Sequence, residues 1–251
     1  MNRHLTAILT HQTPAEVGRM VAWWRDFCGG SDVLVVYGGS EAAFAELAGV
    51  GVSEAVLVVD GRLRTSDHQR ERQSFHGVFR AILGWLAGRE QYETVLFVEF
   101  DGIPLRRDLV ELLRERMAAE GADVLGCGVE RIDGTNHPHF LYHEADAGFR
   151  GLVGRVSVRA EGGVALAMLG CVSCWRRDAF EAVAAVEEAA AFYLEVIIPT
   201  LAHHLGYRVR NLADQSAFVK PSGRAPGGID ELVREGAWMV HPWKEFWGRL
   251  E

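Results

Sequence analysis

Near its middle the chain reads Val95-Leu96-Phe97-Val98-Glu99-Phe100-Asp101, a short apolar run that ends in two carboxylates. A continuous run of this length is typical of a parallel strand that is buried on both faces of a sheet. Residues two apart on a strand point the same way, so we expect Glu99 and Asp101 to converge at its end. Ligands of open parallel sheets bind beyond the carboxyl ends of the strands, which makes this pair a candidate site.

Short apolar runs alternate with helical patterns on both sides of this segment. We expect strands at 5–9, 33–37, 55–59, 95–98 and 124–128. We expect helices at 14–27, 40–47, 66–87 and 105–119, the first opened by Pro14 and closed by glycines. This alternation predicts an α/β fold, an open and mostly parallel Rossmann-like sheet flanked by helices.

The second half is less regular and predicts a smaller, irregular β region. It contains a glycine-rich stretch at 148–170 with short β-like pieces, helices at 178–191 and 193–205, and a loop rich in proline and glycine at 220–228. No repeat or long linker separates the halves, so we expect a single domain over 1–251.

Composition excludes several classes of protein. The 251 residues are 49% hydrophobic and 24% charged, which is ordinary for a globular domain, and the net charge of -8 argues against a nucleic-acid partner. No run approaches the about 20 apolar residues of a transmembrane helix, and the first apolar stretch is too short for a signal peptide. Four cysteines make no disulfide scaffold, so we expect a cytoplasmic protein without a transmembrane segment.

The acidic pair has two readings from the residues alone. Carboxylate and phosphate oxygens are the ligands that Mg2+ and Mn2+ prefer, so Glu99 and Asp101 would suit a metal that also contacts a phosphorylated ligand. An acidic strand end can equally serve only to cap the next helix.

An acidic strand end at 99–101 is followed by a glycine-rich stretch at 162–170, an acidic helix start at 195 and a late histidine at 241. This order resembles the GT-A glycosyltransferases over nearly the whole chain. Glu99-Phe100-Asp101 resembles their DxD motif, with Glu in place of the first Asp, and Gly162 to Gly170 lies where their glycine-rich loop would be. Tyr193-Leu194-Glu195 resembles their xED motif, although Val196 stands where Asp is typical. Val240-His241-Pro242 resembles the late histidine segment that completes the metal site in many members.

The resemblance implies a metal-dependent transferase that moves a sugar from a nucleotide-diphosphate sugar, most often a UDP-sugar, to an acceptor. It implies that Asp101 and His241 hold Mn2+ or Mg2+, with Glu99 assisting or accepting from the ribose. Glu195 would be the general base, which favours inversion at C1. The halves 1–128 and 129–251 would bind the donor and the acceptor, the latter a glycan, lipid, protein or small molecule.

Further residues follow the first strands and are candidates for the nucleotide. Tyr37 would stack on the base, Asp60 would accept from uracil or ribose, and glycines would admit the ligand. Each also fits ordinary turn chemistry. The complete set of candidate nucleotide, phosphate and sugar ligands is Thr10, His11, Tyr37, Gly38, Asp60, Arg72, Gln73, Glu99 and Lys244.

Two alternative functions stay open. A sugar nucleotidyltransferase would carry a glycine- and arginine-rich loop after the first strand, which 10–14 lacks. A degenerate member of the fold would bind a nucleotide or carbohydrate without turnover.

Several remaining features are secondary. The CxxC at Cys171 and Cys174 lacks further ligands for zinc, since only Cys28 and Cys127 remain. The histidines at 137, 139 and 143 favour a polar acceptor-side loop over a separate metal site. Trp175 and Trp243 are candidates for stacking on a sugar, and residues 220–228 for a lid that closes over the donor.

Overall fold

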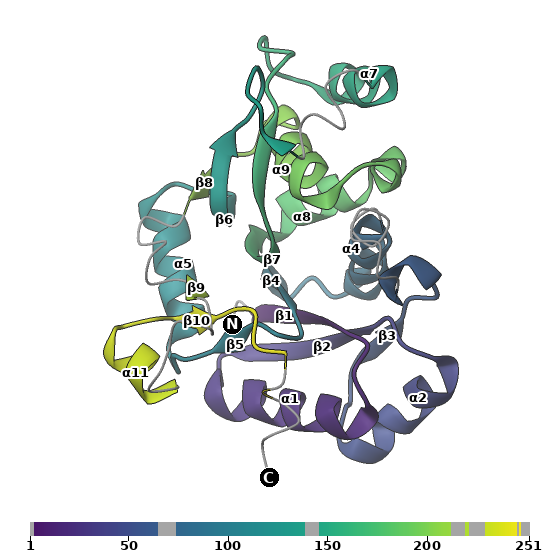
Figure 1. Ribbon diagram of the computed structural model, residues 1–251, viewed down its shortest axis with the longest axis vertical. Helices are drawn as coiled ribbons and strands as arrows, with labels where there is room; N and C mark the ends of the chain where they lie inside the picture. Colours follow the sequence, from purple (N-terminus) through teal and green to yellow (C-terminus); the bar gives the residue numbers. More distant parts are fainter. Residues whose placement is uncertain are drawn as a thin grey trace.

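A seven-stranded sheet with the order β3-β2-β1-β4-β7-β6-β8 forms the centre of the computed structural model (Figure 1). The structure describes residues 3–64, 74–138, 146–211, 219–220, 229–244 and 246. The strands of this sheet are β1 (Arg3–Thr10), β2 (Ser31–Tyr37), β3 (Ala55–Leu57), β4 (Tyr92–Glu99), β6 (Val124–Arg131), β7 (Leu166–Arg176) and β8 (Val209–Asn211). A smaller sheet in the order β5-β10-β9 is formed by β5 (Ile103–Pro104), β10 (Met239–Val240) and β9 (Val219–Lys220).

Strand directions divide the large sheet into two parts. Strands β1 to β4 are all parallel, so their carboxyl ends meet at one edge. Strand β7 runs antiparallel to β4 and β6, and β8 is parallel to β6. The predicted α/β class with a mostly parallel sheet and a smaller irregular β region is therefore confirmed.

Helices cover both faces of the sheet (Figure 1). The α-helices are α1 (Pro14–Phe27), α2 (Glu41–Glu46), α4 (Phe75–Leu86), α5 (Leu109–Ala119), α7 (Ala147–Val156), α8 (Arg177–Ala184), α9 (Leu194–His204) and α11 (Ile229–Arg234). One apolar cluster joins the sheet to α4, α8 and α9, and a second joins it to α1 and α5. Alternate residues of β1 serve the two clusters, as expected for a strand buried on both sides.

Helix α1 has the predicted bounds because its start is strongly encoded. Thr13 and Glu16 form a reciprocal capping box, and Pro14 occupies the first turn, where its missing N–H costs nothing. Ser40 caps α2 with its side chain alone, by accepting from the Ala43 N–H.

The glycine-rich stretch is not β-like at its start, where the prediction is wrong. Asp146 caps α7 by accepting from the Gly148 and Phe149 N–H groups. Phe149, Leu152 and Val153 then bury one helical face, at spacings of three and four residues. Capping and apolar periodicity outweigh the intrinsic cost of the glycines.

Helix α5 begins at Leu109 rather than at residue 105. The residues before it pair with a strand from the far end of the chain: Ile103 pairs with Val240, and the Leu105 N–H donates to the Trp238 carbonyl at 2.8 Å. A predicted long helix at 178–191 is likewise divided, with α8 ending at Ala184 and a 3-10 turn at Glu187–Ala191.

Within the parts of the chain that the structure describes, no helix is both long and apolar enough to cross a bilayer. The proposed lid falls mostly on residues 221–228, which lie outside the described residues, as do the histidines at 139 and 143.

Candidate active site at the carboxyl end of β4

A tight turn after β4 places Asp101. The Gly102 N–H donates back to the Glu99 carbonyl at 2.9 Å. A Cβ atom on Gly102 would lie 2.6 Å from Cγ2 of Val98, which is closer than real Cβ contacts come, so a side chain here would force Val98 or the turn to shift. Asp101 is consequently held against the strand end and is only 3% exposed.

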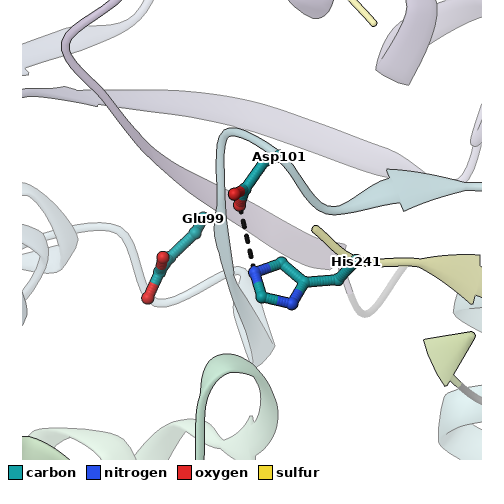
Figure 2. Close-up of side chains that lie close together, drawn as sticks. All are labelled: Glu99, Asp101 and His241. Atoms are coloured by element: carbon teal, nitrogen blue, oxygen red, sulfur yellow. Dashed lines mark ion pairs between the residues drawn. The ribbon is translucent and has the colours of Figure 1, made fainter. Parts of the chain in front are cut away.

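His241 reaches this turn from the far end of the chain. Strand β10 pairs with β5, and the Trp243 N–H donates to the Asp101 carbonyl at 3.0 Å. This pairing brings Nε2 of His241 to 3.1 Å from Oδ1 of Asp101 (Figure 2).

Glu99, Asp101 and His241 form a cluster of potential metal ligands. One ligand atom from each lies within 4.8 Å of the others, and Figure 2 shows the three side chains arranged around one space. Oδ1 of Asp101 is buried yet receives no aligned hydrogen bond from any residue that the structure describes. The contact with Nε2 of His241 is too poorly aligned for a hydrogen bond, and a cation would stabilise this buried carboxylate oxygen. Two carboxylates and an imidazole fit Mg2+ or Mn2+.

A pocket opens beside this cluster at the ends of β1, β2 and β4. It is small, with a volume of about 20 Å³, and is lined by Leu9, Thr10, His11, Gly38, Leu63, Phe75, Glu99 and Phe100. The ring of His11 meets the ring of Phe100 edge-on, with centroids 5.2 Å apart. The pocket brings Thr10, His11, Gly38 and Glu99 together, as the sequence predicts.

Glu195 lies in the first turn of α9 and is attached to β7. Its Oε1 accepts a hydrogen bond from the Gly170 N–H at 2.9 Å. Val98 pairs with Val172 in the antiparallel register of β4 and β7, so the next residues, Glu99 and Cys171, lie near each other. Burial raises the pKa of the Cys171 thiol, and the nearby charges of Glu99, Asp101 and Glu195 raise it further. Glu195 therefore shares one acidic neighbourhood with the potential metal ligands.

Comparison with known proteins identifies the fold. No protein-family model and no curated protein sequence matches the chain. An active-site mutant of LgtC is 14% identical, with 94% of this chain and 86% of that chain covered and a TM-score of 0.50. The chain has a GT-A fold.

Two further solved structures are similar at lower scores. The galactosyltransferase LgtC, in complex with donor and acceptor sugar analogues, is 14% identical over 94% of this chain and 86% of that chain, at a TM-score of 0.48. Core-mannan synthase A from Aspergillus fumigatus, in its Mn/GDP form, is 11% identical over 85% of this chain and 73% of that chain, at 0.44.

Two of the residues predicted to bind the nucleotide instead use their polar groups on other residues of the protein. Tyr37 is 2% exposed, so its ring has no open face for a base, and its hydroxyl donates to the Gln12 carbonyl at 3.0 Å. Burial also raises the pKa of Tyr37. Asp60 binds Arg62 through both carboxylate oxygens, and the hydrogen bond from the Arg62 side chain lowers the pKa of Asp60.

Other predicted groups are distributed differently. Lys244 is exposed, three residues after His241, and Arg72 and Gln73 lie outside the described residues. Trp175 is fully buried and donates from Nε1 to Oγ of Ser173, so the prediction that it stacks on a sugar is wrong. Trp243 is half-buried beside the metal ligands and packs edge-on against Phe246.

All four cysteines are buried free thiols. Burial raises the pKa of Cys28 and of Cys174 to about 12, which keeps both thiols protonated and unreactive.

The sequence analysis missed the apolar walls of the pocket and the glycine that shapes the turn. Phe100 had a local signal, since it stands between the two carboxylates. Leu63 and Phe75 had none, because only the tertiary fold brings them to the strand ends. Gly102 directly follows Asp101, where a tight turn is the ordinary use of glycine.

Proposed function

We propose that the protein is a metal-dependent glycosyltransferase that moves a sugar from a nucleotide-diphosphate sugar to an acceptor. The observation that carries the proposal is the buried Oδ1 of Asp101, which accepts no aligned hydrogen bond from the described residues. It lies beside His241 and Glu99, at the strand end where an α/β sheet binds ligands. The small adjoining pocket opens at the same strand ends.

In this proposal the donor lies along the ends of the parallel strands. The nucleoside would lie over the strand ends beside Thr10, His11 and Gly38, and the diphosphate would extend toward Asp101 and His241. A UDP-sugar is the proposed donor, by analogy with the donors most frequent among enzymes of this fold. Exposed Lys244 adds a positive charge on the phosphate side.

The acidic residues have distinct roles. Asp101 and His241, assisted by Glu99, would hold Mn2+ or Mg2+, which supplies positive charge opposite the leaving diphosphate. Asp101 is the proposed main carboxylate ligand because it is buried, whereas Glu99 is half-buried and also borders the pocket.

Glu195 is the proposed general base. Its carboxylate is oriented by the Gly170 N–H and lies in the same acidic neighbourhood as Glu99 and Asp101. It would accept the proton of the acceptor hydroxyl or amine as that group attacks C1 and the diphosphate leaves, which inverts the configuration.

A binding screen followed by turnover tests the proposal. Nucleotide sugars are screened for a rise in melting temperature with and without Mn2+, since a ligand of the native state stabilises by mass action. We expect one nucleotide sugar to stabilise the protein only with Mn2+ and to be consumed with release of nucleoside diphosphate. Release of pyrophosphate from a nucleoside triphosphate and a sugar phosphate would instead show a nucleotidyltransferase. Binding without consumption would show a degenerate member.

A further inference from the structure

One leucine breaks the burial of β7. Every residue from Ala167 to Trp175 is buried except Leu169, whose exposed fraction is 48%. An isolated exposed leucine is ordinary, so its meaning depends on where it lies and on what places it there.

An irregularity between β6 and β7 places Leu169 at the surface. Gly126 pairs with Ser173, but the next residue, Cys127, pairs with Leu169, so residues 170–172 are extra on β7. Such bulges are frequent beside active sites, where they redirect a side chain. Gly128, at a φ of 67° that favours glycine, lies beside the leucine: a Cβ atom there would be in ordinary contact with Cγ of Leu169 at 3.5 Å.

The bulge also joins Leu169 to the proposed catalytic groups. The residue after it, Gly170, donates its N–H to Glu195, and Cys171 lies beside Glu99. A hydroxyl that transfers its proton to Glu195 must lie within hydrogen-bond distance of that carboxylate. The hydroxyl is therefore within about 6 Å of the Gly170 nitrogen, the backbone atom that directly follows Leu169.

We propose that Leu169 selects acceptors that carry an alkyl or aryl group next to the attacking sugar or alcohol. The inference rests on the proposed function and adds the chemistry of the acceptor to it. A half-exposed leucine gains stabilisation only from an apolar contact, because its side chain has no hydrogen-bonding atom. A purely polar acceptor would leave it in water.

Matched glycosides test the inference. Methyl, n-octyl and p-nitrophenyl glucosides and galactosides, all below micellar concentrations, are compared by saturation-transfer NMR and as acceptors with the nucleotide sugar found above. We expect the octyl and aryl glycosides to bind roughly tenfold more tightly than their methyl counterparts, the combined effect of covering the exposed half of Leu169 and the part of the alkyl or aryl group that contacts it.

Substitutions assign the effect to this residue. Leu169→Asn should remove the preference for octyl and aryl glycosides and leave the affinity for the nucleotide sugar unchanged, and Leu169→Met should retain the preference. Val233 on α11 has a similar exposed fraction, 46%, so Val233→Asn is the matched control and should change nothing.

The outcomes separate the two proposals. If no nucleotide sugar binds or is consumed, the proposed function fails and the inference with it. If a nucleotide sugar is consumed but octyl and methyl glycosides bind equally, or if Leu169→Asn keeps the preference, the inference alone is overturned.

Discussion

Asp101 and His241 lie 3.1 Å apart, Oδ1 to Nε2, although one follows β4 and the other follows β10 near the end of the chain. Backbone pairing creates this contact: Ile103 and Met239–Val240 join the two segments, and Trp243 donates to the carbonyl of Asp101. The small sheet thus assembles the candidate metal site. Because the backbone pairing holds the two segments side by side, the side chains of Asp101 and His241 come into contact.

Glu195→Gln tests the proposed base. The amide oxygen can still accept from the Gly170 N–H, so the position of the side chain should persist while its ability to take a proton is lost. We expect turnover to fall by about 100- to 10,000-fold with donor affinity unchanged. Steady-state kinetics and calorimetry measure the two quantities. The control is Glu188→Gln, which changes an exposed acid paired with Arg155. Near-wild-type turnover of Glu195→Gln would exclude Glu195 as the base.

Gly102→Ala tests the turn that holds Asp101. The added Cβ would lie 2.6 Å from Cγ2 of the fully buried Val98, so either Val98 or the turn must shift, and we expect the turn to move together with Asp101. We expect weaker Mn2+ binding and a loss of stability of about 1–3 kcal/mol. The control is Gly77→Ala in α4, where a Cβ meets nothing within 4 Å and helix propensity predicts a gain of about 1 kcal/mol. Equal Mn2+ affinity in wild type and Gly102→Ala would contradict this account of the turn.

The fold was predictable where local signals and tertiary structure agree. Pro14 and the Thr13 cap fix α1, and the apolar runs fix the parallel strands. Strand β7 was missed because Gly170 and the bulge interrupt its pattern, and because its pairing partners are distant in sequence. Helix α7 was missed because glycine content hid the Asp146 cap.

The candidate site was predictable only in part, for the same reason. Glu99 and Asp101 share a strand end, and His241 was found through the order of motifs. The hydrogen bond from the Tyr37 hydroxyl to the Gln12 carbonyl depends on how the ends of β1 and β2 meet. No local sequence pattern predicts that arrangement. The assignment of 1–128 to the donor and 129–251 to the acceptor stays a prediction.

The ion pairs of Asp123 predict how the stability of the protein changes at acid pH. It is 5% exposed and binds Arg176 at 2.7 Å and Arg208 at 3.1 Å, which ties together β6, β7 and β8. Burial would raise the pKa of Asp123, but the hydrogen bonds and charges of Arg208 and the charge of Arg176 outweigh it and lower the pKa. The stabilisation is therefore present above the unfolded pKa of about 3.9 and is lost as pH falls through the lower folded value.

Asp123→Asn should accordingly destabilise the protein by about 1–3 kcal/mol at pH 7, since both arginines are half-exposed and solvent screens them. The difference from wild type should narrow at pH 3.5. Urea unfolding at the two pH values measures it, with Glu115→Gln on the exposed side of α5 as the control. A difference that does not depend on pH would show that the carboxylate charge contributes nothing.

Mn2+-dependent nucleotide binding tests the central claim most directly. Calorimetric titration of the wild type with UDP, GDP and ADP, with and without Mn2+, selects the nucleotide, and the titration is repeated for Asp101→Asn, His241→Ala and Asp108→Asn. Asp108 is an exposed carboxylate paired with Arg106, which makes it the control. We predict that Mn2+ strengthens binding in the wild type and the control, and that both site variants fold normally but lose this effect. An unchanged effect of Mn2+ in both Asp101→Asn and His241→Ala would contradict the account.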